Sequence, residues 1–136
     1  PYDIYVPFYE QRSMKQLRLL AYVINKIKFA VNDKVCYCLL DKEAFIVTDS
    51  KIEDVDGFTE FLRAIKGVEV SFLITEQEKN AFRVNFRSKG EYTVNDIASS
   101  FNGGGHKFAA GCKISNSNVV DLEKKILNLL DIKMRQ

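Results

Sequence analysis

Three consecutive glycines, Gly103, Gly104 and Gly105, lead directly into His106, the single histidine of this 136-residue chain. Successive glycines let backbone N–H groups point toward one place, where they form a concave nest for an anion. If residues 107–110 begin a helical turn, its free N–H groups and its dipole favour the same anion. His106 would stand at the edge of this nest, where an imidazole can donate to a phosphate oxygen and gain a charge near neutral pH.

A simpler interpretation of these residues is a tight turn that carries a surface histidine. The spacing fits neither the G-x-x-x-x-G-K-[ST] phosphate loop nor the G-x-G-x-x-G motif of dinucleotide-binding proteins. By spacing alone, the anion nest and the turn stand as equal alternatives.

Two further segments contain groups that suit a phosphate. Arg87 and Ser88 end a stretch of alternating apolar and polar residues, so a guanidinium fork and a hydroxyl could hold one anion there. Arg63 lies late in an expected helix, where a cation also suits the helix dipole. From residue type alone, ordinary solvated arginines are the more common alternative at both places.

A complete catalytic centre is not evident among the side chains. One histidine cannot build a multi-histidine metal centre, and the acidic residues show no metal-ligand cluster. Asp54 and Asp56 are two residues apart, and side chains at this spacing point to different sides of a helix. Cys112 lies near His106, but no third group that would orient a thiol nucleophile can be identified. The residues indicate a phosphate-binding module that binds no metal itself.

The composition limits the classes of protein and ligand. Twenty cations against eighteen anions give a formal net charge of only +2, so any anionic ligand is expected to be small or short. The cysteines Cys36, Cys38 and Cys112 are expected to be core residues in a reducing cytoplasm. No apolar run approaches the ~18 residues that a membrane span requires, so we expect a cytoplasmic protein without a membrane partner.

Hydrophobic periodicity predicts one α+β domain over residues 1–136, with a mixed, largely antiparallel sheet of about five strands packed with helices. Segment 42–52 fits either a short helix or a strand. Thr93 is expected to cap a short helix, and Gly67 to end another. The expected helices are residues 10–29, 54–65, 93–101 and 118–134, and the expected strands are residues 34–41, 68–76, 81–88 and 109–115.

The segment VNDIASSFNGGGHKFAAGC, preceded by FRVNFRSKG and by DGFTEFLRAIKGVEV, resembles the DHH-associated C-terminal domain of DHH superfamily phosphoesterases. The nearest branch is the nanoRNase/pAp-phosphatase group, also called exopolyphosphatase-related, and the resemblance runs over residues 9–112. It implies that residues 1–136 form the substrate-binding domain. An N-terminal DHH domain outside this sequence would hold two Mn²⁺ ions and activate the attacking water.

The resemblance also implies ligands and roles. Family members hydrolyse short RNA oligonucleotides and dinucleotides and remove the 3′-phosphate of adenosine 3′,5′-bisphosphate. By this likeness Gly103, Gly104 and Gly105 would give backbone donors to a substrate phosphate, and His106 would contact the scissile phosphate and assist catalysis.

The likeness extends to the arginines, with two departures from the family pattern. Arg87 and Ser88 match a substrate-binding Arg-Ser pair. Arg63 matches an arginine that is often followed by serine, whereas Ala64 follows it here. Phe108 stands where a polar residue is usual, which implies a different preference near the base or ribose.

Two other classes of function are compatible with the sequence. A related, non-hydrolytic domain of alanyl-tRNA synthetases carries a similar glycine-rich motif and binds RNA. In a purely structural interpretation the glycines form a turn and the domain serves as a homodimerisation unit.

Overall fold

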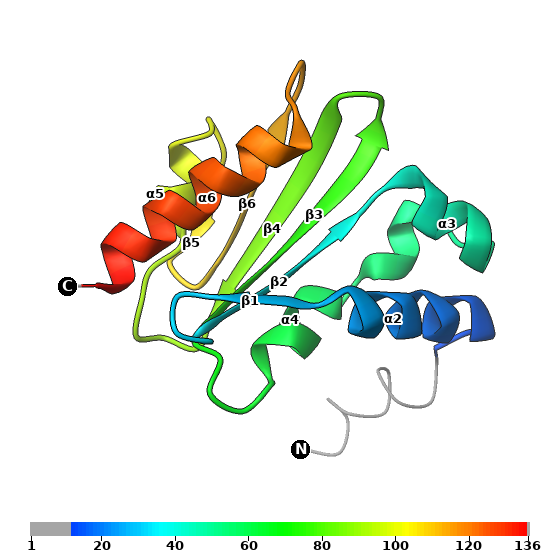
Figure 1. Cartoon of the computed structure of the whole chain (residues 1–136), viewed down its shortest axis with the longest axis horizontal. Helices are drawn as coiled ribbons and strands as arrows, with labels where there is room; N and C mark the ends of the chain where they lie inside the picture. Colours follow the sequence, from blue (N-terminus) through cyan, green and yellow to red (C-terminus); the bar gives the residue numbers. More distant parts are fainter. Residues whose placement is uncertain (1–11, 136) are drawn as a thin grey trace.

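The computed structural model describes residues 12–135, and its strands form one six-stranded sheet in the order β1-β2-β3-β4-β6-β5 (Figure 1). Only β2 and β3 run parallel, and every other neighbouring pair is antiparallel. The strands are β1 (Lys28–Ala30), β2 (Val35–Leu40), β3 (Val70–Glu78), β4 (Ala81–Ser88), β5 (Gly104–His106) and β6 (Ala109–Ile114). The expected α+β class with a mixed, largely antiparallel sheet is confirmed, and the short strands β1 and β5 were not anticipated.

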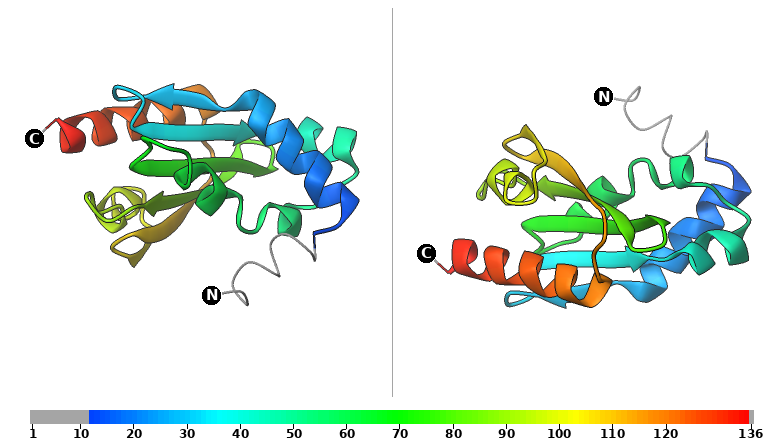
Figure 2. Two further views of the ribbon diagram at one scale, coloured as in Figure 1. Left: turned by 90° about the horizontal axis from the view of Figure 1, so that it is seen from below. Right: turned by 90° about the horizontal axis from the view of Figure 1, so that it is seen from above.

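Helices cover this sheet on both faces. The helical segments are α2 (Met14–Lys26), α3 (Lys42–Thr48), the 3₁₀ turn η1 (Ile52–Val55), α4 (Phe58–Arg63), α5 (Asn95–Ser99) and α6 (Val119–Met134). Figure 2 views the molecule from two opposite sides and shows the strands lying side by side between these helices. Within residues 12–135, no helix combines the length and the apolar character needed to cross a membrane.

One face of the sheet is buried from β2 to β6. Alternate residues of β2, β3, β4 and β6 point into a cluster with the inner sides of α5 and α6. Tyr37 and Phe72 stack there with ring centroids 4.6 Å apart, and Phe86 packs against Phe72 at 5.8 Å. Such offset aromatic contacts add to the burial of apolar area and fix the register of the strands.

The opposite face is buried over only half of its width. Cys36, Cys38 and Leu40 of β2 and Leu73 of β3 pack under α2, α3 and α4. Beyond β3, the residues of β4 and β6 on this face are not part of either core cluster. We call this uncovered part, formed by β4, β6 and β5, the open half-face.

Local signals determine where the helices begin. Ser13 and Gln16 form a reciprocal capping box at the start of α2, and Asn118 accepts from two backbone N–H groups at the start of α6. Asp41 caps α3 by accepting from the Ala44 N–H, which resolves the ambiguous segment 42–52 in favour of a helix followed by η1. These caps satisfy N–H groups that would otherwise lack partners.

Three expected helices have different limits. The first ends at Lys26 rather than residue 29 because residues 28–30 pair with β2 as β1; its expected start at residue 10 lies outside the described residues. The helix expected over residues 54–65 is divided, because Gly57 adopts a φ of 85° between η1 and α4. Val94, not Thr93, is the N-cap of α5, and the Thr93 hydroxyl instead donates to Asp96.

Candidate functional site

The open half-face contains a hollow of about 540 Å³ floored by β4, β6 and β5. Its wall and floor combine cationic side chains with glycines, whose backbone is not covered by a side chain. The lining residues are Arg83, Asn85, Arg87, Asn102, Gly103, Gly104, Ala109, Ala110, Gly111, Cys112 and Lys113. The fold therefore brings Arg87 and two of the predicted glycines, which lie far apart in sequence, to one concave surface.

The strand register arranges this surface in rows. Ala109 of β6 pairs with Arg87 on one side and His106 on the other, so all three side chains share the open face. Two strand spacings separate the Cα atoms of Arg87 and His106, which places them about 10 Å apart. Gly111 likewise pairs with both Asn85 and Gly104, and Lys113 pairs with Arg83.

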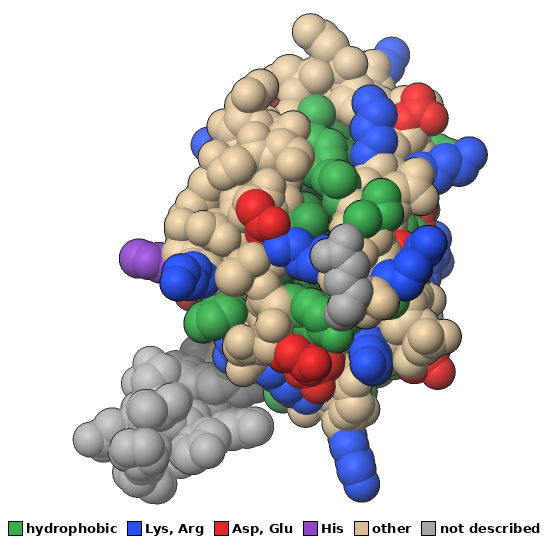
Figure 3. All heavy atoms as spheres, turned by 90° about the vertical axis from the view of Figure 1, so that its left-hand side faces the viewer, with side chains coloured by type: hydrophobic (Ala, Val, Ile, Leu, Met, Phe, Trp, Pro, Cys, Tyr) green, Lys and Arg blue, Asp and Glu red, His purple; other side chains and the backbone are tan. Residues whose placement is uncertain are grey.

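His106 is exposed and lies beside the hollow, not among its lining residues. The purple side chain in Figure 3 projects from the surface, free of the core. A short turn at Lys107 and Phe108 holds it in place: the Lys107 carbonyl accepts from the Val94 N–H at 2.7 Å, and the Phe108 carbonyl accepts from the Ser88 N–H at 2.9 Å. These bonds attach the turn between β5 and β6 to the end of β4 and to the residue before α5.

Residues 107–110 do not begin a helical turn, the condition under which a helix dipole would have favoured the anion. These residues form the turn of the β5–β6 hairpin and the beginning of β6. Gly104 and Gly105 accordingly belong to an edge strand rather than to a nest of successive turned N–H groups, and Gly103 directly precedes this strand. The Gly103 N–H donates to the Ala98 carbonyl at 2.9 Å, where it closes the end of α5 after Asn102 at a φ of 62°.

The three glycines differ in what surrounds them. A Cβ on Gly103 would lie 2.2 Å from the Gly111 carbonyl oxygen, and Gly105 combines a φ of 143° with backbone atoms at 2.8 Å. Both are required by the close approach of β6. A Cβ on Gly104 would meet nothing within 4 Å. Packing does not require glycine at this one position, which borders the hollow.

Arg87 lies between two hollows. Its Nη1 donates to the Phe86 carbonyl at 2.8 Å, and its Nε lies 3.5 Å from the Glu60 carboxylate on α4. A second hollow of about 530 Å³ shares Arg83, Asn85 and Arg87 with the first and is walled by η1 and the start of α4. The polar face of β4 thus forms the ridge between a basic and a more acidic depression.

The remaining predicted residues lie outside these surfaces. Ser88 is buried on the opposite side of β4 from Arg87, and its hydroxyl accepts from the Gly90 N–H at 3.1 Å. Arg63 is half-buried at the end of α4 and lines neither hollow. The structure brings Arg87, His106 and Gly104 together but leaves Ser88 and Arg63 apart from them.

The cysteines are buried and unpaired. Burial raises the pKa of Cys36 and of Cys112 to about 11, so both thiols are protonated at neutral pH. Cys112 packs in the core on the face opposite His106. In the described part of the chain, no three His, Cys, Asp or Glu side chains gather as a metal site would require.

Sequence reasoning did not select Arg83, Asn85, Lys113 or Glu60 as site residues. A signal existed for two of them, because Arg83, Asn85 and Arg87 alternate with apolar residues in β4 and must therefore share one face. Lys113 required the register of β6, and Glu60 required the packing of α4, which no local pattern specifies.

The fold is that of a domain family found in phosphoesterases. The chain matches the DHHA1 domain family over residues 32–134 and belongs to it. Its homologues are DHH phosphoesterases, so the family is enzymatic.

Two curated relatives illustrate this. The chain is 26% identical over 116 residues to the bifunctional oligoribonuclease and PAP phosphatase NrnA of Thermus thermophilus. The aligned region covers 85% of this chain and 34% of NrnA. It is 28% identical over 68 residues to the cyclic-di-AMP phosphodiesterase PdeA of Listeria monocytogenes. Here the aligned region covers 50% of this chain and 10% of PdeA. The chain spans about a third of NrnA and a tenth of PdeA.

Two solved structures share this fold. An exopolyphosphatase-related protein from Bacteroides fragilis superimposes with a TM-score of 0.84 at 27% identity, over 99% of this chain and 40% of that chain. The pGpG-specific phosphodiesterase PggH from Vibrio cholerae gives a TM-score of 0.60 at 11% identity, over 96% of this chain and 42% of that chain, and shares the fold.

Proposed function

We propose that this chain is the substrate-binding domain of a phosphoesterase that hydrolyses short oligoribonucleotides, dinucleotides or adenosine 3′,5′-bisphosphate. The observation that carries the proposal is the row of His106, Ala109 and Arg87 beside the bare backbone of Gly104 and Gly111. Arg87 and His106 lie on either side of the small side chain of Ala109, and the two glycines next to this row leave room for a compact anion. The activities after which NrnA and PdeA are named both concern phosphate esters of nucleotides.

In this proposal each group has a distinct task. The Arg87 guanidinium retains donors beyond those directed at Phe86 and Glu60, and it binds a phosphate by a charge-assisted hydrogen bond. His106, exposed on β5, donates to the same phosphate and adds positive charge as negative charge develops in the transition state. The small residues between them let the ligand approach the sheet closely.

The hydrolytic step itself belongs to a second domain in this proposal. Mn²⁺ ions bound there would supply the activated water, as expected for the DHH domain. This chain would hold the substrate against that centre, and closure of the two domains would exclude water from the phosphate.

The test is equilibrium binding of a 5′-phosphorylated diadenylate to the chain and to a His106→Ala variant. We expect the variant to bind about tenfold more weakly, the range of one charge-assisted hydrogen bond. Lys107→Ala is the matched control, since Lys107 is the exposed neighbour in the same turn but lies outside the rows. Equal affinity in wild type and His106→Ala would remove His106 from the site, and tRNA that outcompetes the dinucleotide would contradict the proposed ligand class.

A further inference from the structure

The far end of the hollow carries a second pair of cations. Arg83 of β4 and Lys113 of β6 are direct register partners, and both side chains are exposed on the open half-face. Within residues 12–135, neither forms an ion pair with a carboxylate. Two like charges therefore stand side by side without a neutralising partner.

This pairing is unfavourable for the fold alone. Residues directly opposite on antiparallel strands have Cβ atoms about 5 Å apart, and like charges at that position destabilise the pair. An anion placed between the two side chains would reverse the sign of this interaction. The arrangement is that of a ligand site rather than of a stabilising cross-strand contact.

The position of the pair defines the length of a ligand. Arg83 and Arg87 are four residues apart on β4, which corresponds to about 13 Å along the strand. Between the two cationic ends the floor is formed by Asn85, Gly111 and Gly104, with no charged side chain. A separation of this size exceeds the step between neighbouring phosphates of one nucleic-acid strand and fits phosphates two nucleotides apart.

We infer that Arg83 and Lys113 form a second phosphate subsite, which binds a phosphate two nucleotides away from the one held at Arg87 and His106. This inference rests on the proposed function of the first site. It makes affinity depend on ligand length: a trinucleotide reaches both subsites, whereas a dinucleotide or a nucleoside bisphosphate reaches only the first.

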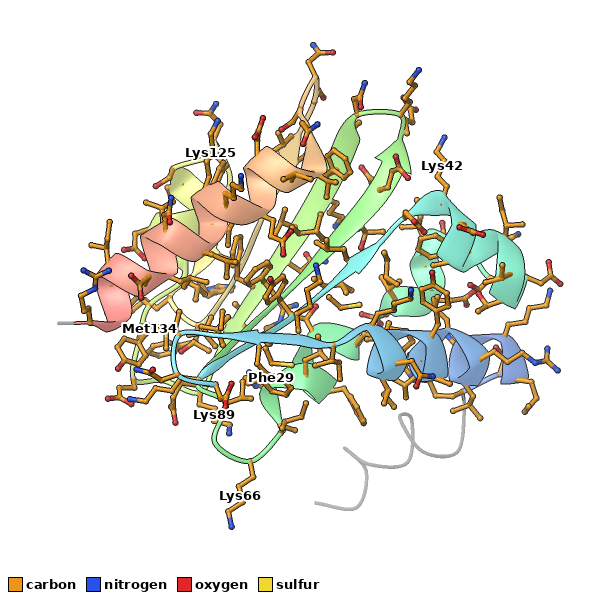
Figure 4. The ribbon with its side chains drawn as sticks, viewed as in Figure 1. Phe29, Lys42, Lys66, Lys89, Lys125 and Met134 are labelled. Atoms are coloured by element: carbon orange, nitrogen blue, oxygen red, sulfur yellow. The ribbon has the colours of Figure 1, made fainter. Side chains whose placement is uncertain are left out.

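The experiment compares 5′-phosphorylated di-, tri- and tetra-adenylate binding to the wild-type chain and to the double variant Arg83→Gln/Lys113→Gln. The matched control is Arg18→Gln/Lys125→Gln, which removes the same two charges from exposed positions on α2 and α6 that do not line the hollow; Lys125 is labelled in Figure 4. Because the substituted side chains are exposed, both double variants are expected to fold, which circular dichroism verifies.

We expect the wild type and the control to bind the trinucleotide at least about tenfold more tightly than the dinucleotide. The Arg83/Lys113 variant should bind the trinucleotide no more tightly than the dinucleotide. Its affinity for the dinucleotide should stay within about twofold of the control. The slope of log affinity against log salt for the trinucleotide should fall by about 0.7, the value for one phosphate contact to a single strand.

Different outcomes separate the inference from the function on which it rests. If the dinucleotide binds through His106 but the trinucleotide binds no better, or if the double variant weakens both ligands equally, the second subsite is refuted and the first site stands. If the wild-type chain binds none of the ligands, the proposed function itself is contradicted.

Discussion

The Nε of Arg87 lies 3.5 Å from a carboxylate oxygen of Glu60, so a side chain of α4 partly neutralises the arginine that faces the hollow. The guanidinium is largely covered, with 23% of its side chain exposed, whereas Glu60 is 43% exposed. A phosphate that approaches Arg87 must compete with this carboxylate for its charge.

Neutralising that carboxylate should strengthen anion binding. We expect Glu60→Gln to raise the affinity for a 5′-phosphorylated dinucleotide by up to about fivefold at low salt, since a partly exposed ion pair is worth at most about 1 kcal/mol. Titration calorimetry at low and high salt measures the effect, which should shrink as salt screens both interactions.

Glu53→Gln is the matched control, because Glu53 lines the second hollow without an ion pair to Arg87. A weaker affinity in Glu60→Gln than in this control would show that the carboxylate acts by holding Arg87 in its binding orientation.

Gly103 and Gly104 should respond differently to the same substitution. Gly103→Ala places a methyl group 2.2 Å from the Gly111 carbonyl oxygen, and we expect it to lower the free energy of unfolding by about 3 kcal/mol. Gly104→Ala meets no atom within 4 Å, so its stability should stay within about 1 kcal/mol of wild type. Urea denaturation measures both.

The Gly104→Ala variant should also be tested for dinucleotide binding. Because Gly104 lies on the open half-face, its added methyl group should weaken dinucleotide binding although the fold is intact. Unchanged binding by a folded Gly104→Ala variant would show that the ligand does not approach this strand.

Thr75 offers a test of buried polar groups. Its side chain is 1% exposed, and its hydroxyl has no hydrogen-bond partner among the residues described. Thr75→Val should therefore stabilise the protein by about 1 kcal/mol, because the isosteric methyl group avoids the desolvation cost of an unpaired hydroxyl.

Thr48 provides the opposite case in the same experiment. Its buried hydroxyl donates to the Ala44 carbonyl at 2.7 Å, so Thr48→Val should cost about 1 kcal/mol. Equal loss of thermal stability in both variants would indicate that Thr75 has acquired a partner in solution.

Asp96 couples α5 to α6 and should make stability depend on pH. Burial acts to raise the pKa of Asp96, but hydrogen bonds from Lys133 and Thr93 and the charge of Lys133 outweigh it and hold this pKa below its ordinary value of 3.8. A lowered folded-state pKa stabilises the fold above the unfolded-state value, and this contribution disappears as the pH falls through the folded-state pKa.

The measurement is the difference in unfolding free energy between wild type and Asp96→Asn. We expect about 0.5 kcal/mol at pH 7, the scale of a solvent-screened pair, and a difference that shrinks as the pH falls below 4. A difference that grows on acidification would contradict this sign. Asp121→Asn on α6 is the control, because Asp121 forms no ion pair within residues 12–135.

Local patterns predicted some of these elements well. The bounds of β4 match the expectation at both ends, because its strict alternation of apolar and polar residues specifies a half-buried strand without reference to its neighbours. The final helix was likewise recognisable from its amphipathic spacing and from Asn118 at its start.

The errors concern pairing between distant segments. Nothing near residue 29 indicates that Phe29 will pair with Cys36, so a helical pattern was extended into a strand. Three successive glycines fit either an anion nest or a strand packed closely against another backbone. Only the position of β6 decides between these two structures. The same register places Lys113 beside Arg83, which is why the sequence alone did not indicate Lys113.

The half-covered sheet also has an evolutionary consequence. On β4 and β6, every second side chain belongs to the core, while those between them face the hollow and contribute little to folding. Substitutions at the outward positions can therefore accumulate without loss of the fold. One scaffold can thus diversify toward different ligands by changing a few exposed residues, while the strands that carry them stay the same.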